Sequence, residues 1–135
     1  MKAAALFFFY LYAASLVVFG GVCVFTARLD QHLLFRLDTA SLPAGTAASL
    51  LSQYRFSRAI ECGFGVFALA FRSAIFERRL FNRIFLGGML GGVAARAISL
   101  AADGRPFPVF YVFLLTELVG GSLILLYSRT TVKEP

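Results

Sequence analysis

Three ionisable side chains, Glu61, Arg96 and Glu117, stand inside long apolar stretches of this sequence. A charge at the centre of a membrane helix costs about 2.5–3.5 kcal/mol, so such residues usually face other helices and have partners there. A guanidinium can bridge two carboxylates, which would largely neutralise the group. The same side chains could instead bind a polar ligand, or a desolvated carboxylate could act as a general acid or base.

Helix geometry predicts that the three charges lie in the same half of a membrane. With a rise of 1.5 Å per residue, Arg96 lies about 12 Å from the turn at Gly104, and Glu117 lies about 18 Å from Arg105. Glu61 lies roughly 5–10 Å below the same outer surface by that rise. We therefore predict a Glu61–Arg96–Glu117 triad in the outer half of a helical bundle. Two carboxylates beside one arginine leave excess negative charge, unless Arg58 supplies a second cation or one acid stays protonated.

Three functional hypotheses follow from this cluster. The first is a non-enzymatic protein that binds a small or amphipathic ligand in an outward-facing polar cavity. The second is an intramembrane acid/base enzyme, such as an isomerase acting on a lipid-soluble substrate. The third is a structural subunit whose buried charges only hold helices together. Which residues would be catalytic stays unknown, and the predicted ligand-binding residues are Glu61, Arg96, Glu117, Arg58, Ser99, Asp103 and Arg105.

Neither a metal nor a cofactor is expected. The sequence has two cysteines and one histidine, with no CxxC pair and no zinc spacing. Cys23 and Cys62 are either free thiols or a disulfide, and the sequence leaves both open. Nucleic-acid binding is also not expected, because the net charge of +6 comes from arginines that lie between apolar runs rather than along one face.

The composition places the charged cluster in a membrane protein. Hydrophobic residues make up 59% of the 135 residues, whereas soluble domains contain about 45–50%. A soluble protein of this length has too high a surface-to-volume ratio to hide so much apolar surface. We expect a single all-α domain, residues 1–135, that uses the lipid bilayer as its solvent.

Four stretches are long enough to cross a hydrocarbon core of about 30 Å as helices. The first is too long for the hydrophobic region of a signal peptide, so we expect it to be a span. In the polar outer loop 28–53, Leu29, Leu33 and Leu37 recur every four residues, which favours a short amphipathic helix on the membrane surface. The sequence predicts an integral membrane four-helix bundle with spans at about residues 3–27, 54–76, 84–102 and 107–127.

Basic residues set the expected orientation. Four spans place both termini on the same side as the link between the second and third spans. Three arginines fall within residues 77–83, and the positive-inside rule assigns such a dense cluster to the cytoplasm. We therefore expect both termini to be cytoplasmic. The basic residues on that side are Lys2, Arg78, Arg79, Arg83, Arg129 and Lys133.

Glycines recur within the predicted third span. Gly87 with Gly91, and Gly88 with Gly92, have the small-xxx-small spacing that lets helices approach closely. This spacing favours packing inside the bundle, and a homodimer formed through the same face is the alternative. The expected partners are therefore the bilayer, a small or amphipathic ligand, and a second copy of this chain.

Several segments together resemble a known family. They are Arg58-Ala-Ile-Glu61-Cys-Gly63-Phe-Gly65, Arg96-Ala-Ile-Ser99-Leu-Ala-Ala-Asp103-Gly104-Arg105-Pro106 and Glu117-Leu-Val-Gly120. Over roughly residues 50–128, this pattern is similar to that of the small bacterial four-helix membrane proteins grouped as domain of unknown function 4345. The resemblance implies a multi-pass protein of the bacterial inner membrane and brings no established activity.

Overall fold

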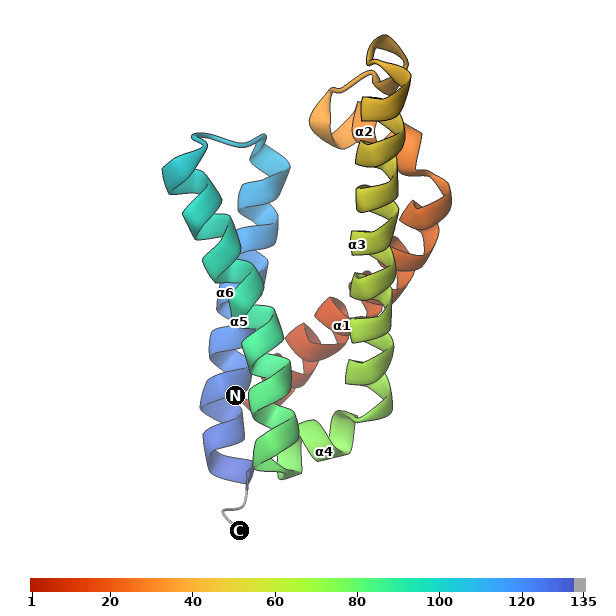
Figure 1. Ribbon diagram of the computed structural model, residues 1–135. Helices are drawn as coiled ribbons and strands as arrows, with labels where there is room; N and C mark the ends of the chain where they lie inside the picture. Colours follow the sequence, from red (N-terminus) through yellow and green to blue (C-terminus); the bar gives the residue numbers. More distant parts are fainter. Residues whose placement is uncertain (133–135) are drawn as a thin grey trace. The chain divides into compact units, whose positions relative to one another are not determined.

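A computed structural model describes residues 1–132 of the chain (Figure 1); Lys133, which the sequence assigns to the cytoplasmic side, lies outside the described residues. Contacts divide the chain into two compact units. One contains residues 1–12 and the chain from residue 68 onward, and the other contains residues 13–67. The elements in chain order are α1 (Lys2–Phe25), α2 (Ala27–Phe35), the 3-10 turn η1 (Thr39–Ser41), α3 (Ala44–Ala70), α4 (Arg72–Glu77), α5 (Arg79–Ala102) and α6 (Pro108–Thr131).

Three of these helices, α1, α5 and α6, are long and apolar enough to cross a membrane. They overlap the predicted spans at 3–27, 84–102 and 107–127. The long elements of residues 1–132 are all helices, so the all-α class is confirmed. Helix α5 begins at Arg79, five residues before the predicted span. Polar residues in its first turns are compatible with helix, because arginine and leucine favour it and neither glycine nor proline interrupts them.

The second predicted span, residues 54–76, falls on two helices instead of one. Helix α3 begins at Ala44, ten residues early, and the chain breaks at Phe71 before α4 starts. Within residues 55–61 α3 carries three charges, and it is not among the helices of membrane-spanning length and apolarity. The count of four spans therefore stays a prediction. The charges in question are Arg55, Arg58 and Glu61.

A short helix does form in the predicted outer loop. Helix α2 leaves Leu29 and Leu33 more than half exposed, whereas Leu37, the third leucine of the pattern, lies beyond its end. A position on the membrane surface stays a prediction. The helix ends where Arg36 adopts a left-handed conformation with φ of 52°. Asp38 then accepts a hydrogen bond from the Ala40 N–H at 2.9 Å and caps the 3-10 turn.

In the unit of residues 13–67, the second half of α1 crosses α3 at very short backbone distance. A Cβ built on Gly20 would lie 2.6 Å from the Cys62 backbone nitrogen, and one built on Gly65 would lie 2.8 Å from the Ala13 carbonyl oxygen. Only glycine permits this approach, because any side chain would collide with backbone. Beyond the crossing, a buried cluster continues toward α2 and consists of Cys23, Ala27, Leu51 and Tyr54.

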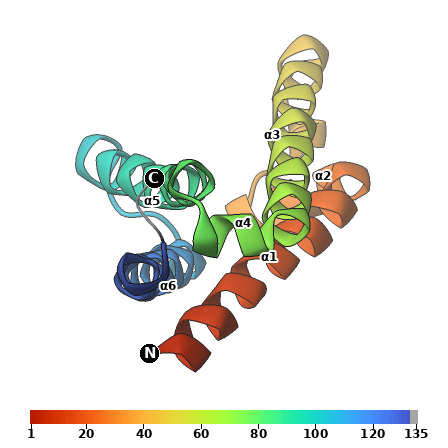
Figure 2. The same cartoon turned by 90° about the horizontal axis from the view of Figure 1, so that it is seen from below.

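In the other unit, α5 and α6 lie side by side (Figures 1 and 2). The Phe9 ring packs against the rings of Phe76 and Phe85, with centroid distances of 5.2 Å in both cases. Where α4 ends, the buried Asn82 amide donates to the Ile75 carbonyl at 3.0 Å. This bond satisfies one of the carbonyls that a helix terminus leaves without an intrahelical partner.

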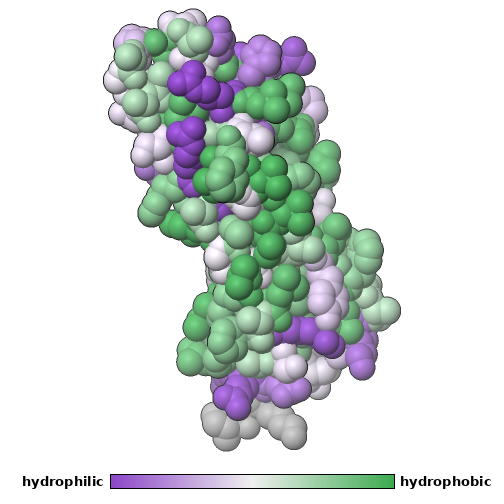
Figure 3. Space-filling model, turned by 90° about the vertical axis from the view of Figure 1, so that its right-hand side faces the viewer, coloured by the Kyte–Doolittle hydropathy of each residue, from purple (hydrophilic) through white to green (hydrophobic). Residues whose placement is uncertain are grey.

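Many large apolar side chains are exposed on the helix surfaces. Phe7, Phe19 and Phe25 are all more than half exposed, and so are Val112 and Leu115. Hydrophobic residues cover much of the face drawn in Figure 3. Such surface would drive aggregation in water and suits contact with lipid. The exposed side chains and the three long apolar helices together characterise a membrane protein.

Candidate functional site

The two long helices α5 and α6 are joined by an ion pair between Arg96 and Glu117. Arg96 Nε donates to Glu117 Oε2 at 3.0 Å, and Nη2 donates to Oε1 at 3.3 Å. This side-on, bidentate geometry is the strongest arrangement of arginine and carboxylate. The Arg96 guanidinium also lies over the Phe113 ring, 5.6 Å from its centroid.

Helix periodicity explains why these side chains meet. Phe113 and Glu117 are four residues apart and therefore share one face of α6, which faces α5. Gly92 lies one turn before Arg96, and a Cβ built there would be 3.8 Å from Glu117 Oε2. The Glu117 carboxylate thus lies next to Gly92, on the face of α5 that also carries Arg96. The Glu117 side chain is 14% exposed and that of Arg96 is 34% exposed.

A second ion pair lies within α3. Arg58 Nη1 donates to Glu61 Oε2 at 2.7 Å, and the two residues are one helical turn apart. The Arg58 guanidinium lies 4.9 Å from the centroid of the Tyr54 ring, a distance at which a cation is attracted to the ring face. Arg58 Nε is buried and has no hydrogen-bond partner among the residues that the structure describes.

The structure shows two ion pairs among the predicted residues, one in each unit. Arg96 and Glu117 belong to the unit that holds α5 and α6, whereas Arg58 and Glu61 belong to the unit of residues 13–67. Arg58 supplies the second cation that the charge count required. A contact of Glu61 with Arg96 stays a prediction.

The residues predicted at the mouth of the site lie at the end of α5. The Ser99 hydroxyl donates to Asp103 Oδ2 at 2.6 Å, and both residues are exposed. Gly104 follows with φ of 95°, a conformation that favours glycine, and turns the chain toward Pro108. Arg105 is exposed in this turn. A role for these three polar residues in ligand binding stays a prediction.

Comparison with protein families decides the relationship that the sequence suggested. The model of a domain of unknown function, DUF4345, matches residues 4–128, which is nearly the whole chain. The chain belongs to the DUF4345 family. The match extends the resemblance seen over residues 50–128 to include α1. Comparison with curated proteins and with solved structures gave no significant match.

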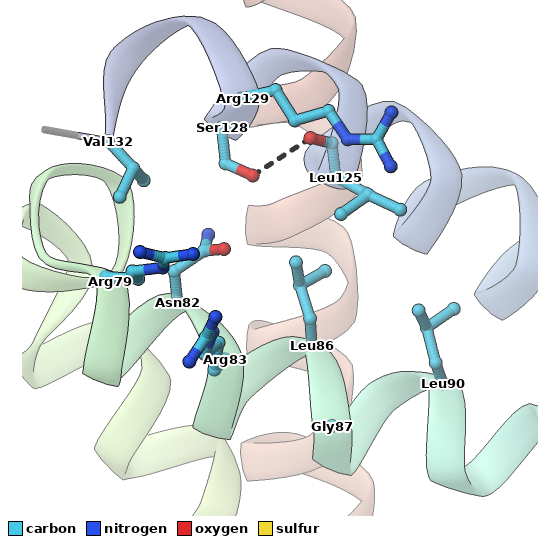
Figure 4. A pocket seen from close by; sticks show the side chains of 10 residues that line it. All are labelled: Arg79, Asn82, Arg83, Leu86, Gly87, Leu90, Leu125, Ser128, Arg129 and Val132. Atoms are coloured by element: carbon cyan, nitrogen blue, oxygen red, sulfur yellow. Dashed lines mark hydrogen bonds between the residues drawn. The ribbon is translucent and has the colours of Figure 1, made fainter. Parts of the chain in front are cut away.

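In this DUF4345 chain, a second group of polar residues lines a pocket that the sequence did not predict. The pocket has a volume of about 710 Å³ and lies between the first turns of α5 and the last turns of α6 (Figure 4). Arg79, Arg83 and Arg129 line it. The sequence pattern marked these arginines only as topological charges. Arg79 and Arg83 are four residues apart on α5, and this spacing was the signal that these two share one face.

The described part of this chain contains no set of side chains that could bind a metal ion. Residues 1–132 contain no group of three or more histidine, cysteine or acidic side chains placed to hold a metal ion. Cys23 and Cys62 are both free thiols. The disulfide that the sequence left open is therefore not formed here.

Proposed function

We propose that this DUF4345 protein is a multi-pass membrane protein that binds a small amphipathic molecule beside the Arg96–Glu117 ion pair. Both termini would face the cytoplasm, and the site would open toward the outer side of a bacterial inner membrane. The observation that carries the proposal is the ion pair itself: a bidentate pair between two helices of membrane-spanning length, with the Arg96 side chain one-third exposed.

The geometry of Arg96 leaves donors for a ligand. Glu117 engages Nε and Nη2, which lie on one edge of the guanidinium. The Nη1 amino group lies on the opposite edge and points away from that carboxylate. Because the arginine side chain is partly exposed, this edge can donate to a ligand oxygen without breaking the ion pair.

Charge balance favours a polar but uncharged head group. Arg96 and Glu117 together carry no net charge, so an ionic ligand would have to be desolvated without a compensating charge, which is costly in a medium of low dielectric constant. A hydroxyl or ester group needs only hydrogen bonds. The apolar surface around the pair suits an acyl chain. We therefore propose a lipid-soluble molecule with a hydroxyl-bearing or ester head, such as a monoacylglycerol.

The acid/base enzyme is less favoured by this geometry. Both carboxylate oxygens of Glu117 accept hydrogen bonds from Arg96. Proton abstraction by Glu117 would therefore first require the ion pair to open. The purely structural hypothesis remains the second candidate, because a bidentate interhelical pair can also fix the register of two helices.

A photoreactive monoacylglycerol tests the proposal. The full chain is placed in phosphatidylcholine nanodiscs, a monooleoylglycerol with a diazirine in its acyl chain is added, and cross-links are mapped by mass spectrometry. We expect saturable labelling of α5 and α6 near Arg96 and Phe113. The charge-neutral double variant Arg96→Gln/Glu117→Gln should reduce this labelling at least fivefold.

Two further samples separate binding from structure. Arg96→Lys keeps the positive charge but lacks the fork that bonds Glu117 side-on, and it should also reduce labelling. An oleate with the same photoreactive chain should label more weakly than the monoacylglycerol, because its head group is charged. Labelling that stays at the wild-type level in both Arg96 variants would overturn the proposal and favour the structural role.

A further inference from the structure

The pocket between α5 and α6 changes from polar to apolar along its length. Arg79, Asn82 and Arg83 line it near the start of α5, and Leu86 and Leu90 line it one and two turns further along (Figure 4). Helix α6 runs in the opposite direction, so its last turn, which carries Arg129, lies beside the start of α5, and the Arg129 side chain extends toward Leu125, one turn further inward (Figure 4). Both helices thus contribute residues to the change from polar to apolar lining.

The pocket is lined by positive charge from both helices. Arg83 and Arg129 are exposed, as is Arg79. Among the described residues that line the pocket, none is acidic. The two buried polar side chains already have partners, since the Asn82 amide donates to Ile75 and the Ser128 hydroxyl donates to the Leu125 carbonyl at 3.0 Å. The attraction for a ligand therefore comes from the guanidinium groups of Arg83 and Arg129.

This arrangement matches the chemistry of an anionic phospholipid. Guanidinium groups bind phosphate oxygens through paired hydrogen bonds. The leucines continue from the arginines toward the middle of two membrane-length helices, along the path an acyl chain follows below its head group. Gly87 lies between them and lines the pocket, and a Cβ there would meet no atom within 4 Å. That open space leaves room for the chain.

We propose that this pocket binds the phosphodiester head group of an anionic membrane lipid, with Arg83 and Arg129 holding the phosphate and Leu86, Leu90 and Leu125 contacting the acyl chain. The site is separate from the Arg96–Glu117 pair, which lies 13 residues beyond Arg83 on α5, roughly 20 Å at 1.5 Å per residue. It requires net negative charge in its ligand, whereas the neutral pair favours an uncharged head. A basic pocket between membrane helices at their cytoplasmic ends is a common place for anionic lipid.

Free phosphate is a poorer match than lipid. It would use only the arginine end and leave the leucine-lined part of the pocket unoccupied. It would also have to be drawn from water to exposed arginines, where ion pairing is weak. The leucine-lined end of the pocket therefore favours lipid over free phosphate, and the experiment below compares the two ligands.

The test is a lipid titration followed by native mass spectrometry of the full chain released from detergent micelles. The probes are dioleoylphosphatidylglycerol, dioleoylphosphatidylcholine and inorganic phosphate. We expect one phosphatidylglycerol to be retained at least tenfold more tightly than phosphatidylcholine. Arg83→Gln/Arg129→Gln should weaken retention of phosphatidylglycerol at least tenfold, and inorganic phosphate at equal concentration should not displace the lipid.

Two controls identify the pocket as the cause. Arg78 lies next to Arg79 but does not line the pocket, so Arg78→Gln removes one positive charge outside the pocket, half of what the double variant removes, and should change retention by less than twofold. Gly87→Leu places a side chain in the open part of the pocket and should weaken retention of the lipid without removing an arginine. Equal weakening by Arg78→Gln and by the double variant would overturn the proposal, because surface charge alone would then explain it. Retention of inorganic phosphate in place of the lipid would overturn it as well.

Discussion

Replacing Arg96 by glutamine is expected to lower the free energy of unfolding by about 2 kcal/mol, because the Glu117 carboxylate would lose two charge-assisted hydrogen bonds while staying 14% exposed. Glu117→Gln should cost a similar amount, since it leaves the guanidinium unpaired beside Phe113. The double variant removes both charges together. It should therefore cost less than the sum of the two, with a coupling of about 1–2 kcal/mol.

Unfolding in mixed micelles of increasing sodium dodecyl sulfate content would measure these differences. The chain has no tryptophan, so near-ultraviolet circular dichroism of tyrosine and phenylalanine is the appropriate signal. Ser99→Ala is the matched control on α5, because its hydroxyl bonds Asp103 on an exposed surface and surface substitutions usually change stability by less than about 0.5 kcal/mol. Strictly additive effects of the two substitutions at the ion pair would contradict the interhelical contact.

The second large effect is expected at the crossing of α1 and α3. Gly20→Ala should destabilise the unit of residues 13–67 by about 2–3 kcal/mol, because the added methyl would lie 2.6 Å from the Cys62 nitrogen and 2.8 Å from the Arg58 carbonyl oxygen. Backbone atoms cannot move aside as a flexible side chain can. The two helices would have to separate. Gly65→Ala should act similarly, since its methyl would meet backbone of Ala13 and Val17.

Gly63→Ala is the control for this prediction. Gly63 lies on the same helix, two residues from Gly65, and a Cβ there meets no atom within 4 Å. Alanine favours helix over glycine by about 1 kcal/mol, so this variant should be neutral or slightly stabilising. The thiols provide the measurement, because Cys23 is buried beside the crossing. A thiol-reactive dye should label Gly20→Ala at lower temperature than wild type. Thiol labelling at the same temperature in the Gly20→Ala and Gly63→Ala variants would refute the close crossing of α1 and α3.

The Arg96–Glu117 pair could be predicted from sequence because strong periodicity fixes its faces. Both residues stand alone in apolar helices, and Gly92 leaves room beside Arg96. The Arg58–Glu61 pair has the three-residue spacing of helix neighbours, and the sequence offered Arg58 as the second cation. Which acid would pair with which base depended on tertiary structure, because Glu61 could reach toward either arginine.

The break at Phe71 and the early start of α3 could not be predicted in the same way. Neither glycine nor proline marks the break, so the local sequence reads as continuous helix. Residues 44–53 follow Pro43 and end the polar stretch 28–53, which indicated a loop. Their alanine and leucine content nevertheless supports helix. Polarity and helix propensity favoured different structures, and propensity prevailed.

Glycine spacing was an incomplete guide to where helices meet, because it marked Gly92, which lies beside Glu117 of α6, but also Gly87 and Gly91. Gly87 and Gly91 have the small-xxx-small spacing, yet a Cβ on either would meet no atom within 4 Å. Their face stays open, and a homodimer through it stays a prediction. The close crossing instead uses Gly20 and Gly65, which lie on different helices and form no repeat. Likewise, Arg129 joins Arg79 and Arg83 in one pocket only because α6 runs antiparallel to α5.

The central claim is that Arg96 binds a ligand while its guanidinium stays paired with Glu117. The side-chain NMR signal of Arg96 tests this claim most directly. The protein is labelled with ¹⁵N-arginine in phosphatidylcholine nanodiscs, and the Nε–H resonance of Arg96 is identified by its loss in Arg96→Gln. We expect this resonance to exchange slowly with water, because Nε–H donates to Glu117, and to shift in a saturable manner as monooleoylglycerol is added. An Arg96 resonance that exchanges slowly but stays unshifted throughout the titration would contradict the account and leave the ion pair with a structural role.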